Sequence, residues 1–212
     1  AGAMDVSAGC TGFVYALAMA AGAVASGFQD HALVVGAEAI SRLLDWKDRS
    51  TAVLFGDGAG AVVVSAAEAP AAGILGFDLG GDGRGDEFLL IPAGGSRLPA
   101  SHATVEAREH YMRMNGHEVY KFATRVVADS ARRVLKRCNR EVGDIDLFVP
   151  HQANLRIIDA AVKKLGFSED RVYTNLQRYG NTSCASIPLC LSEARAEGRL
   201  HDGDLVLLMG FG

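Results

Sequence analysis

The sequence predicts an α/β protein in which helices cover β-sheets. Unbroken apolar runs of strand length alternate along the chain with longer helical stretches. One unit occurs twice, between residues 8 and 36 and between residues 174 and 210: a turn with a cysteine, a helix of small residues, a glycine turn and a buried strand. The alternation is typical of parallel strands joined by helices, and the recurrence indicates a duplicated architecture.

The first unit is centred on Cys10. An extended run over residues 3–8 stops at Gly9, and an alanine-rich helix is expected over residues 10–25. Cys10 then lies at a strand-to-helix turn, where unpaired backbone N–H groups and the helix dipole favour a thiolate and can hold an oxyanion. A cysteine is more commonly a small buried hydrophobic residue, and Cys10 taken alone does not outweigh that interpretation.

A buried strand and a glycine-rich turn follow this helix. Residues 31–36 form an unbroken apolar run, which predicts a strand. Two further apolar runs, at 51–55 and 59–65, flank the sequence GDG, and a DG pair between such runs favours a hairpin or a tight turn. A phosphate-binding loop is the weaker interpretation, because no helix and no Gly-Lys-Ser/Thr sequence follows.

The rest of the chain continues the alternation of strands and helices. Apolar residues at helical spacing predict a long amphipathic helix over residues 114–139. The other elements expected in order are a strand at 73–79, an irregular stretch at 80–99, a strand at 146–150, a helix capped by 151–154 and ending near 165, a short strand at 172–174, a loop at 179–183, a helix at 184–196 and a strand at 204–209.

Charge and cysteine usage argue against several functional classes. The formal net charge is −4, so no basic field points to nucleic acid or to an anionic membrane surface. No apolar run approaches membrane-spanning length. The four cysteines lack the spacing of a zinc site, which favours a reduced, cytoplasmic protein without a structural metal.

Two further residues are candidates for chemistry. His151 follows a strand and a proline at the start of a helix, and Asn181 lies between Gly180 and Thr182. By default the histidine is a capping or solvated residue and the asparagine a turn residue. Cys, His and Asn can form an activated-nucleophile set, as in papain-like proteases, but the residues around Cys10 do not match that family.

Four separated segments together resemble 3-oxoacyl-(acyl-carrier-protein) synthase III, the initiating condensing enzymes of bacterial fatty-acid synthesis. They are DVSAGCTGF at 5–13, FGDGAG at 55–60, HQANLRII at 151–158 and GNTSCASIP at 180–188. The resemblance runs through the whole chain and implies a thiolase-like layered αβαβα architecture with duplicated halves. Residues 1–70 would form the end of the N-terminal half with the nucleophile, and residues 71–212 most of the C-terminal half.

The resemblance implies roles for three side chains. Cys10 matches the nucleophile that accepts an acyl group from an acyl-CoA primer, with acetyl-CoA favoured. His151 and Asn181 match the pair that hydrogen-bonds the malonyl thioester and stabilises the enolate formed as CO₂ leaves. The enolate then attacks the acyl-cysteine to give 3-oxoacyl-carrier protein, and no metal or redox cofactor is required.

The resemblance also implies substrate and partner contacts. Ile40 and Phe55 match acyl-pocket positions, and the residues matching other substrate contacts are Arg49, Met114, Gly116 and Asn154. A basic patch for the acidic acyl carrier protein would comprise Lys121, Arg156, Lys163 and Lys164, although such a patch is usually just a solvated helix face. His117, Tyr120 and Cys184 depart from the residues usual in the family. A homodimer is the family expectation, with no nucleic-acid or membrane partner.

The family pattern extends beyond both ends of this chain. We therefore expect the chain to lack the N-terminal part and the extreme C-terminus, and the isolated chain to be poorly soluble or inactive because sheet edges and apolar helix faces would be exposed. Two alternatives stay open: a polyketide or other specialised condensing enzyme with a different primer, and a non-catalytic thiolase-fold subunit that only binds partners.

Overall fold

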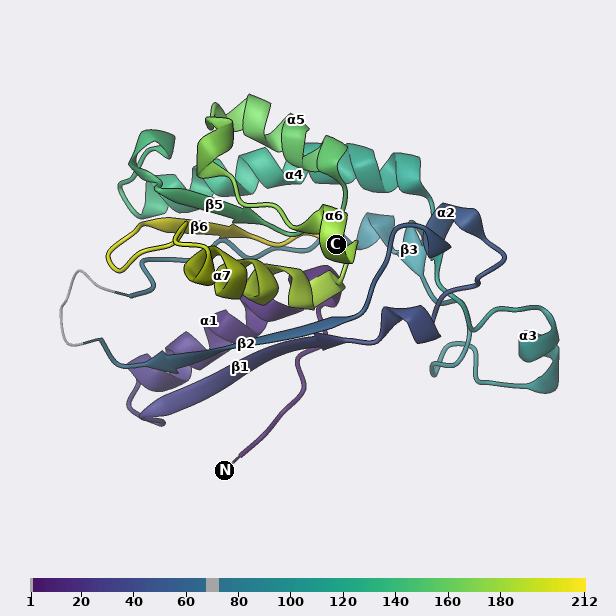
Figure 1. The fold of residues 1–212 in the computed structure, drawn as a ribbon. Helices are drawn as coiled ribbons and strands as arrows, with labels where there is room; N and C mark the ends of the chain where they lie inside the picture. Colours follow the sequence, from purple (N-terminus) through teal and green to yellow (C-terminus); the bar gives the residue numbers. More distant parts are fainter. Residues whose placement is uncertain (1, 68–72) are drawn as a thin grey trace.

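The computed structural model describes residues 2–67 and 73–212 as a stack of alternating layers (Figure 1). Helices α4 (Gly116–Arg137) and α5 (Leu155–Leu165) form one outer layer over a sheet of β5 (Leu147–Pro150) and β6 (Val206–Met209). Below that sheet lie α1 (Gly12–Ala25) and α7 (Ser186–Ala196), and then a second sheet of β1 (His31–Glu38) and β2 (Gly58–Ser65). The layers confirm the predicted α/β class.

Shorter elements connect these layers. They are the 3₁₀ turns η1 (Gly9–Thr11), η2 (Ile40–Arg42), η3 (Gly83–Gly85), η4 (Val142–Asp144), η5 (Glu169–Arg171) and η6 (Ser183–Ala185), the short helices α2 (Arg49–Ala52), α3 (His102–Glu106) and α6 (Leu176–Tyr179), and the paired strands β3 (Leu89–Leu90) and β4 (Arg113–Met114). No helix in the described ranges is long and apolar enough to span a membrane.

Strand β5 shows why its sheet needs a helical layer on each side. All four of its residues are buried. Phe148 packs in one hydrophobic cluster with residues of α4 and α5, whereas Leu147 and Val149 belong to a second cluster with residues of α1 and α7. Because neighbouring side chains of a strand point to opposite faces, a continuous apolar strand requires cover on both.

Strand direction agrees with the prediction in one sheet and not in the other. β5 and β6 are parallel, but β1 and β2 are antiparallel, with His31 opposite Ser65. The hairpin interpretation of the apolar runs at 51–55 and 59–65 was wrong, because Asp48 accepts a hydrogen bond from the Ser50 N–H (2.9 Å) and caps the short helix α2 at the start of the first run. The DG pair therefore does not join the two apolar runs as a hairpin, and β2 pairs with β1 instead.

Three expected strands are absent from the described residues. Residues 2–8 pair with no other strand, and Val172 makes only an isolated bridge to Phe148. Residues 73–79 are held by α4 rather than by a sheet, because the Asp78 carboxylate binds Arg133 (2.7 Å) and Arg137 (3.0 Å). The predicted boundary between 70 and 71 lies outside the described residues.

The repeated unit of the sequence is visible as two equivalent pieces of backbone. In each, a 3₁₀ turn leads into a helix of the middle layer and then into a strand: η1, α1 and β1 in the first, η6, α7 and β6 in the second. Each turn begins with a residue of positive φ, Gly9 (53°) and Ser183 (51°), and each of these precedes a cysteine. The shared conformation confirms the recurrence of element order.

Gly36 allows the first sheet to approach the second turn closely. A Cβ atom at this position of β1 would lie 2.6 Å from the carbonyl oxygen of Cys184 and 3.0 Å from its carbonyl carbon. Real Cβ atoms do not come this close to backbone atoms, so a larger residue would push β1 away from η6.

We predict that Gly36→Ala lowers the free energy of unfolding by about 2–3 kcal/mol, because the added methyl collides with backbone that cannot rotate away. Gly22→Ala is the matched control: Gly22 lies in α1 with no atom within 4 Å of the position of a Cβ, and alanine there is neutral or stabilising by about 1 kcal/mol. Urea denaturation of both variants checks this, and equal effects would contradict the close approach.

Candidate active site

Cys10 lies in the first turn of a helix, as the sequence predicts. Turn η1 runs directly into α1, and the side chain is buried. Gly212 packs against it so closely that a Cβ there would lie 2.6 Å from Cys10 Cβ and 3.0 Å from Sγ. Only glycine at 212 leaves room for the sulfur.

The ionisation of Cys10 differs from the sequence-based expectation. Burial raises the pKa of the thiol above its usual value, and the negative charge of Glu38 raises it further. A side-chain hydrogen bond with Ser183 lowers the pKa but does not offset burial. The expected thiolate-favouring environment is therefore not what the structure shows, because loss of water disfavours the charged form of the thiol.

His151 is a neutral imidazole at the end of β5. The residue is fully buried, and this burial lowers its pKa to about 3. Nδ1 lies 2.6 Å from the Ser186 hydroxyl oxygen, and the ring meets Phe211 edge-on with centroids 5.2 Å apart. Nε2 has no hydrogen-bond partner within the described part of the chain. Within the described residues, Nδ1 is thus hydrogen-bonded to the protein and Nε2 is not.

Asn181 is fixed through its backbone and its carboxamide oxygen. Its N–H donates to Leu54 O (2.8 Å) and its carbonyl accepts from Gly56 N–H (2.9 Å), which places it beside Phe55. Its Oδ1 accepts from Ser183 N–H (2.8 Å). Asn181 Nδ2 forms no hydrogen bond with the described residues, so its amide N–H groups remain free to donate to a ligand.

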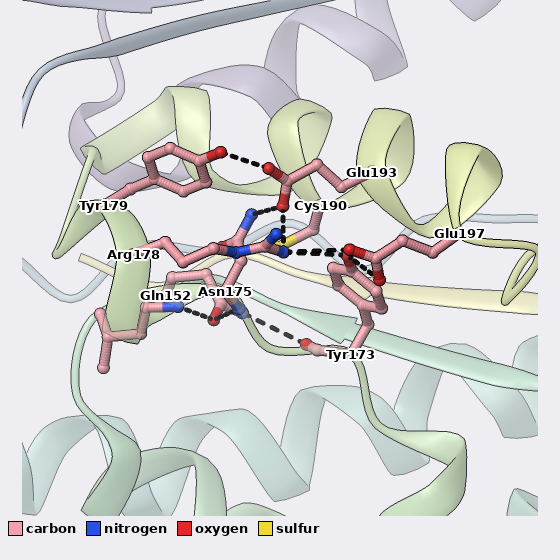
Figure 2. A network of polar contacts seen from close by, with 9 residues as sticks. Gln152, Tyr173, Asn175, Arg178, Tyr179, Cys190, Glu193 and Glu197 are labelled. Carbon is pink, nitrogen blue, oxygen red and sulfur yellow. Dashed lines mark hydrogen bonds and ion pairs between the residues drawn. The ribbon is translucent and has the colours of Figure 1, made fainter.

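A polar network holds the loop that carries Asn181 (Figure 2). Glu193 on α7 accepts hydrogen bonds from Asn175 Nδ2 (2.8 Å), from Arg178 Nη2 (2.7 Å) and from the Tyr179 hydroxyl. Gln152, directly after His151, accepts from the Asn175 N–H (3.0 Å). The chain following His151 is therefore bound to the loop preceding Asn181.

Sequence reasoning did not find these supporting residues. Gln152, Asn175 and Glu193 come from three separate segments, and only the fold brings them together. Gln152 and Ser186 lie within the matched segments HQANLRII and GNTSCASIP, which was the one available signal.

A cavity of about 1620 Å³ opens beside Cys10. Its wall includes Ile40 and Phe55, so the structure brings both predicted acyl-pocket residues together with Cys10. His151 and Asn181 do not line the cavity themselves. Each is next to residues that do: His151 contacts Phe211, and Asn181 binds the backbone of Ser183.

The remaining predicted residues lie outside that wall. Arg49 is exposed at the start of α2, Met114 is in β4, Gly116 begins α4, and Asn154 is the N-cap of α5, where its Oδ1 accepts from Arg156 N–H (2.9 Å). The four predicted carrier-protein residues are all exposed on the outer helical layer, Lys121 on α4 and Arg156, Lys163 and Lys164 on α5. Their roles stay predictions.

Comparisons with known proteins show the family of this chain. The family description "3-Oxoacyl-[acyl-carrier-protein (ACP)] synthase III" matches residues 4–83, and its C-terminal counterpart matches residues 135–212. A β-ketoacyl-(acyl-carrier-protein) synthase III of Symbiobacterium thermophilum is 53% identical over 212 residues, which cover 100% of this chain and 64% of that protein. The chain thus spans about 64% of the length of this curated relative.

Solved structures also match this chain. A crystal structure of a β-ketoacyl-(acyl-carrier-protein) synthase III from Thermus thermophilus matches with a TM-score of 0.88 and 48% identity, over 97% of this chain and 62% of that one. The priming β-ketosynthase of a polyketide biosynthetic pathway matches with a TM-score of 0.86 and 39% identity, over 100% and 62%. The fold is thus the thiolase-like α/β fold. The chain belongs to the 3-oxoacyl-(acyl-carrier-protein) synthase III family.

We predict that His151 makes the protein less stable as the pH falls. The pKa of His151 is lowered from 6.5 to about 3 in the fold, so between these values only the unfolded chain binds the proton. Between about pH 5.5 and 4.5 the free energy of unfolding should therefore fall by about 1.4 kcal/mol more in the protein than in His151→Gln.

Chemical denaturation at the two pH values measures this difference. His102→Gln removes an exposed histidine and serves as the control; it should keep the slope of the unaltered protein. A His151→Gln variant with that same slope would show that the imidazole is not buried as a neutral group.

Proposed function

We propose that the protein to which this chain belongs catalyses the initiating condensation of fatty-acid synthesis. In this reaction an acyl-CoA primer, with acetyl-CoA favoured, is joined to malonyl-acyl carrier protein. One observation carries the proposal: among the described residues neither His151 Nε2 nor Asn181 Nδ2 has a hydrogen-bond partner, and both side chains lie next to residues that share a cavity wall with Cys10. Two free N–H donors near the buried thiol of Cys10 can stabilise an oxyanion.

The proposed first step is acyl transfer to Cys10. The sulfur attacks the thioester carbonyl of the primer, the new carbon–sulfur bond forms, and CoA leaves as the thiol after taking up the proton that Cys10 loses. Because burial raises the pKa of Cys10, the thiol is mainly protonated at neutral pH, and loss of the proton accompanies the attack.

In the proposed second step the malonyl group loses CO₂. The electron pair of the breaking carbon–carbon bond moves onto the thioester oxygen as an enolate, which accepts hydrogen bonds from His151 Nε2–H and Asn181 Nδ2–H. Because His151 is neutral and shielded from water, its N–H acts in a low dielectric, where a hydrogen bond to developing charge is strong. The enolate carbon then attacks acyl-Cys10, and the thiolate leaves. The sequence of steps is redox-neutral.

Further substrate contacts form part of the proposal. Ile40 and Phe55 would bound the acyl group, since both line the cavity of Cys10. The exposed Arg49 would bind the nucleotide end of CoA, and Met114 and Gly116 would flank its pantetheine arm. Asn154, the N-cap of α5, would also contact the substrate.

The proposed partners are the acyl carrier protein and a second copy of the chain. Arg156, Lys163 and Lys164 support the first, because they are exposed on one helix and form no ion pair within the described ranges. Homodimerisation, a cytoplasmic location and the division into halves at residues 70 and 71 follow from the family resemblance.

A second candidate is a condensing enzyme that primes polyketide synthesis. The polyketide ketosynthase that matches at 39% identity supports it. The two functions share the three side chains and differ in the primer, so a comparison of kcat/KM for acetyl-CoA and for longer acyl-CoA primers separates them.

We predict that incubation with acetyl-CoA adds one acetyl group to the protein and that Cys10→Ser abolishes the adduct. Cys184 lines the same cavity, but burial and then Glu38 raise the pKa of its thiol to about 12, which makes it a poor nucleophile. Cys138→Ser, at the end of α4, is the matched control and should be acetylated like the unaltered protein. Intact-mass spectrometry reads both. Acetylation of Cys10→Ser would contradict the assigned nucleophile, and a protein that takes up no acetyl group would favour the non-catalytic alternative.

We also predict that Arg156→Glu raises KM for malonyl-carrier protein about fivefold with little change in kcat, since replacing an exposed attraction by repulsion costs about 1 kcal/mol. Arg97→Glu changes the net charge equally from the loop before α3 and should leave KM unchanged. Steady-state kinetics at low and high salt check this. The difference in KM between the two variants should shrink as the salt concentration rises. Equal KM values for both variants would show that α5 is not part of the docking surface.

A further inference from the structure

Ser186 is the one described side chain that hydrogen-bonds the ring of His151. Its Oγ lies 2.6 Å from Nδ1, and both side chains are buried at the junction of β5 and α7. The same oxygen accepts a hydrogen bond from the backbone N–H of Gln152 (3.3 Å). We propose that Ser186 is a positioning residue that keeps His151 in the tautomer with its proton on Nε2.

The hydroxyl proton of Ser186 has one acceptor within reach among the described residues. An N–H group can only donate, so the Gln152 contact uses a lone pair of Oγ and leaves its proton without an acceptor. The described residues offer this oxygen no acceptor besides Nδ1. Ser186 therefore donates to Nδ1, which must be unprotonated, and the ring proton of the neutral imidazole is on Nε2.

The opposite tautomer would leave two groups unsatisfied. With the proton on Nδ1, the Ser186 hydroxyl would accept from both neighbours, and its own proton would be buried without an acceptor. Nε2 would then present a lone pair with no hydrogen-bond donor from the described part of the chain. The first arrangement satisfies the hydroxyl fully and leaves a single free group, an N–H donor.

Two further contacts keep this arrangement rigid. Ser186 begins α7, the helix whose Glu193 binds the Asn181 loop. Gln152, which supplies the N–H to Ser186, is itself held through its side chain, because its Nε2 donates to Pro150 O (2.7 Å). The burial that lowers the pKa of His151 adds to this effect, because a neutral ring has one N–H to place rather than two.

The consequence for catalysis rests on the proposed function. An enolate oxygen accepts hydrogen bonds, so only the tautomer with Nε2–H can stabilise it alongside Asn181. The acyl transfer to Cys10 makes no use of this proton. Loss of the Ser186 hydroxyl should therefore slow the condensation and leave the acetylation of Cys10 unchanged.

The direct test is ¹⁵N NMR of the histidine side chains of the protein at neutral pH, with His151 assigned by comparison with His151→Gln. We expect Nδ1 of His151 at the position of an unprotonated ring nitrogen and Nε2 at that of an N–H, and a shift toward the opposite tautomer or a mixture in Ser186→Ala. Ser192→Ala, an exposed serine of the same helix, is the matched control and should leave the spectrum unchanged. A proton on Nδ1 in the unaltered protein, or an unchanged tautomer in Ser186→Ala, would overturn the proposal.

Steady-state kinetics provide a second test. Ser186→Ala should lower kcat of condensation about 10- to 100-fold with little effect on KM, by analogy with the loss of one oxyanion donor, and Ser186→Thr, which retains a hydroxyl, should recover part of the rate. The NMR result does not depend on the reaction, so an Nε2–H tautomer in a protein that fails to condense would refute the proposed function and leave the role of Ser186 intact. Normal condensation by Ser186→Ala would overturn the catalytic consequence.

Discussion

The close packing of two cysteine-bearing turns, η1 and η6, is the constraint on which the site depends. Gly36 of β1 lies against the backbone of Cys184 at a distance that excludes a Cβ, and a Cβ at Gly12 would already touch Cys184 (3.4 Å). Because these positions have no side chain, the start of α1 and the segment 181–186 come together. Cys10 of the first repeated unit thereby lies beside Ser183 of the second, whose backbone N–H binds Asn181, so the proposed site needs both units.

Burial at this junction determines the charge state of the site. The same loss of water raises the pKa of Cys10 and lowers that of His151, so both side chains are neutral at pH 7. A neutral imidazole whose Nδ1 already hydrogen-bonds the protein is suited to donate a hydrogen bond through Nε2. It is less suited to act as a charged group or as a general base. In the proposed chemistry, the negative charge of the enolate develops on the substrate oxygen, which accepts hydrogen bonds from the N–H groups of His151 and Asn181.

The sequence predicted the long helices, the strands of the buried sheet and the recurrent unit, because apolar periodicity and caps such as Asn154 are local signals. It failed where contacts with other segments decide the outcome: Asp48 caps helix α2 at the start of the apolar run 51–55, and residues 73–79 are held by arginines of α4. The pKa of Cys10 was also misjudged, since the helix N-terminus is readable from sequence and burial is not. Ser186 and Glu193 act through contacts between distant segments, which no single stretch reveals.

The central claim is that two neutral donors stabilise an enolate, and release of CO₂ from malonyl-carrier protein measures that step without the acyl transfer. We would compare the unaltered protein with Asn181→Ala, which retains Cys10. The account predicts that Asn181→Ala still forms acetyl-Cys10 but releases CO₂ about 100-fold more slowly, the usual cost of one oxyanion donor. Unchanged CO₂ release, with acetylation lost instead, would place Asn181 in the first step and contradict the account.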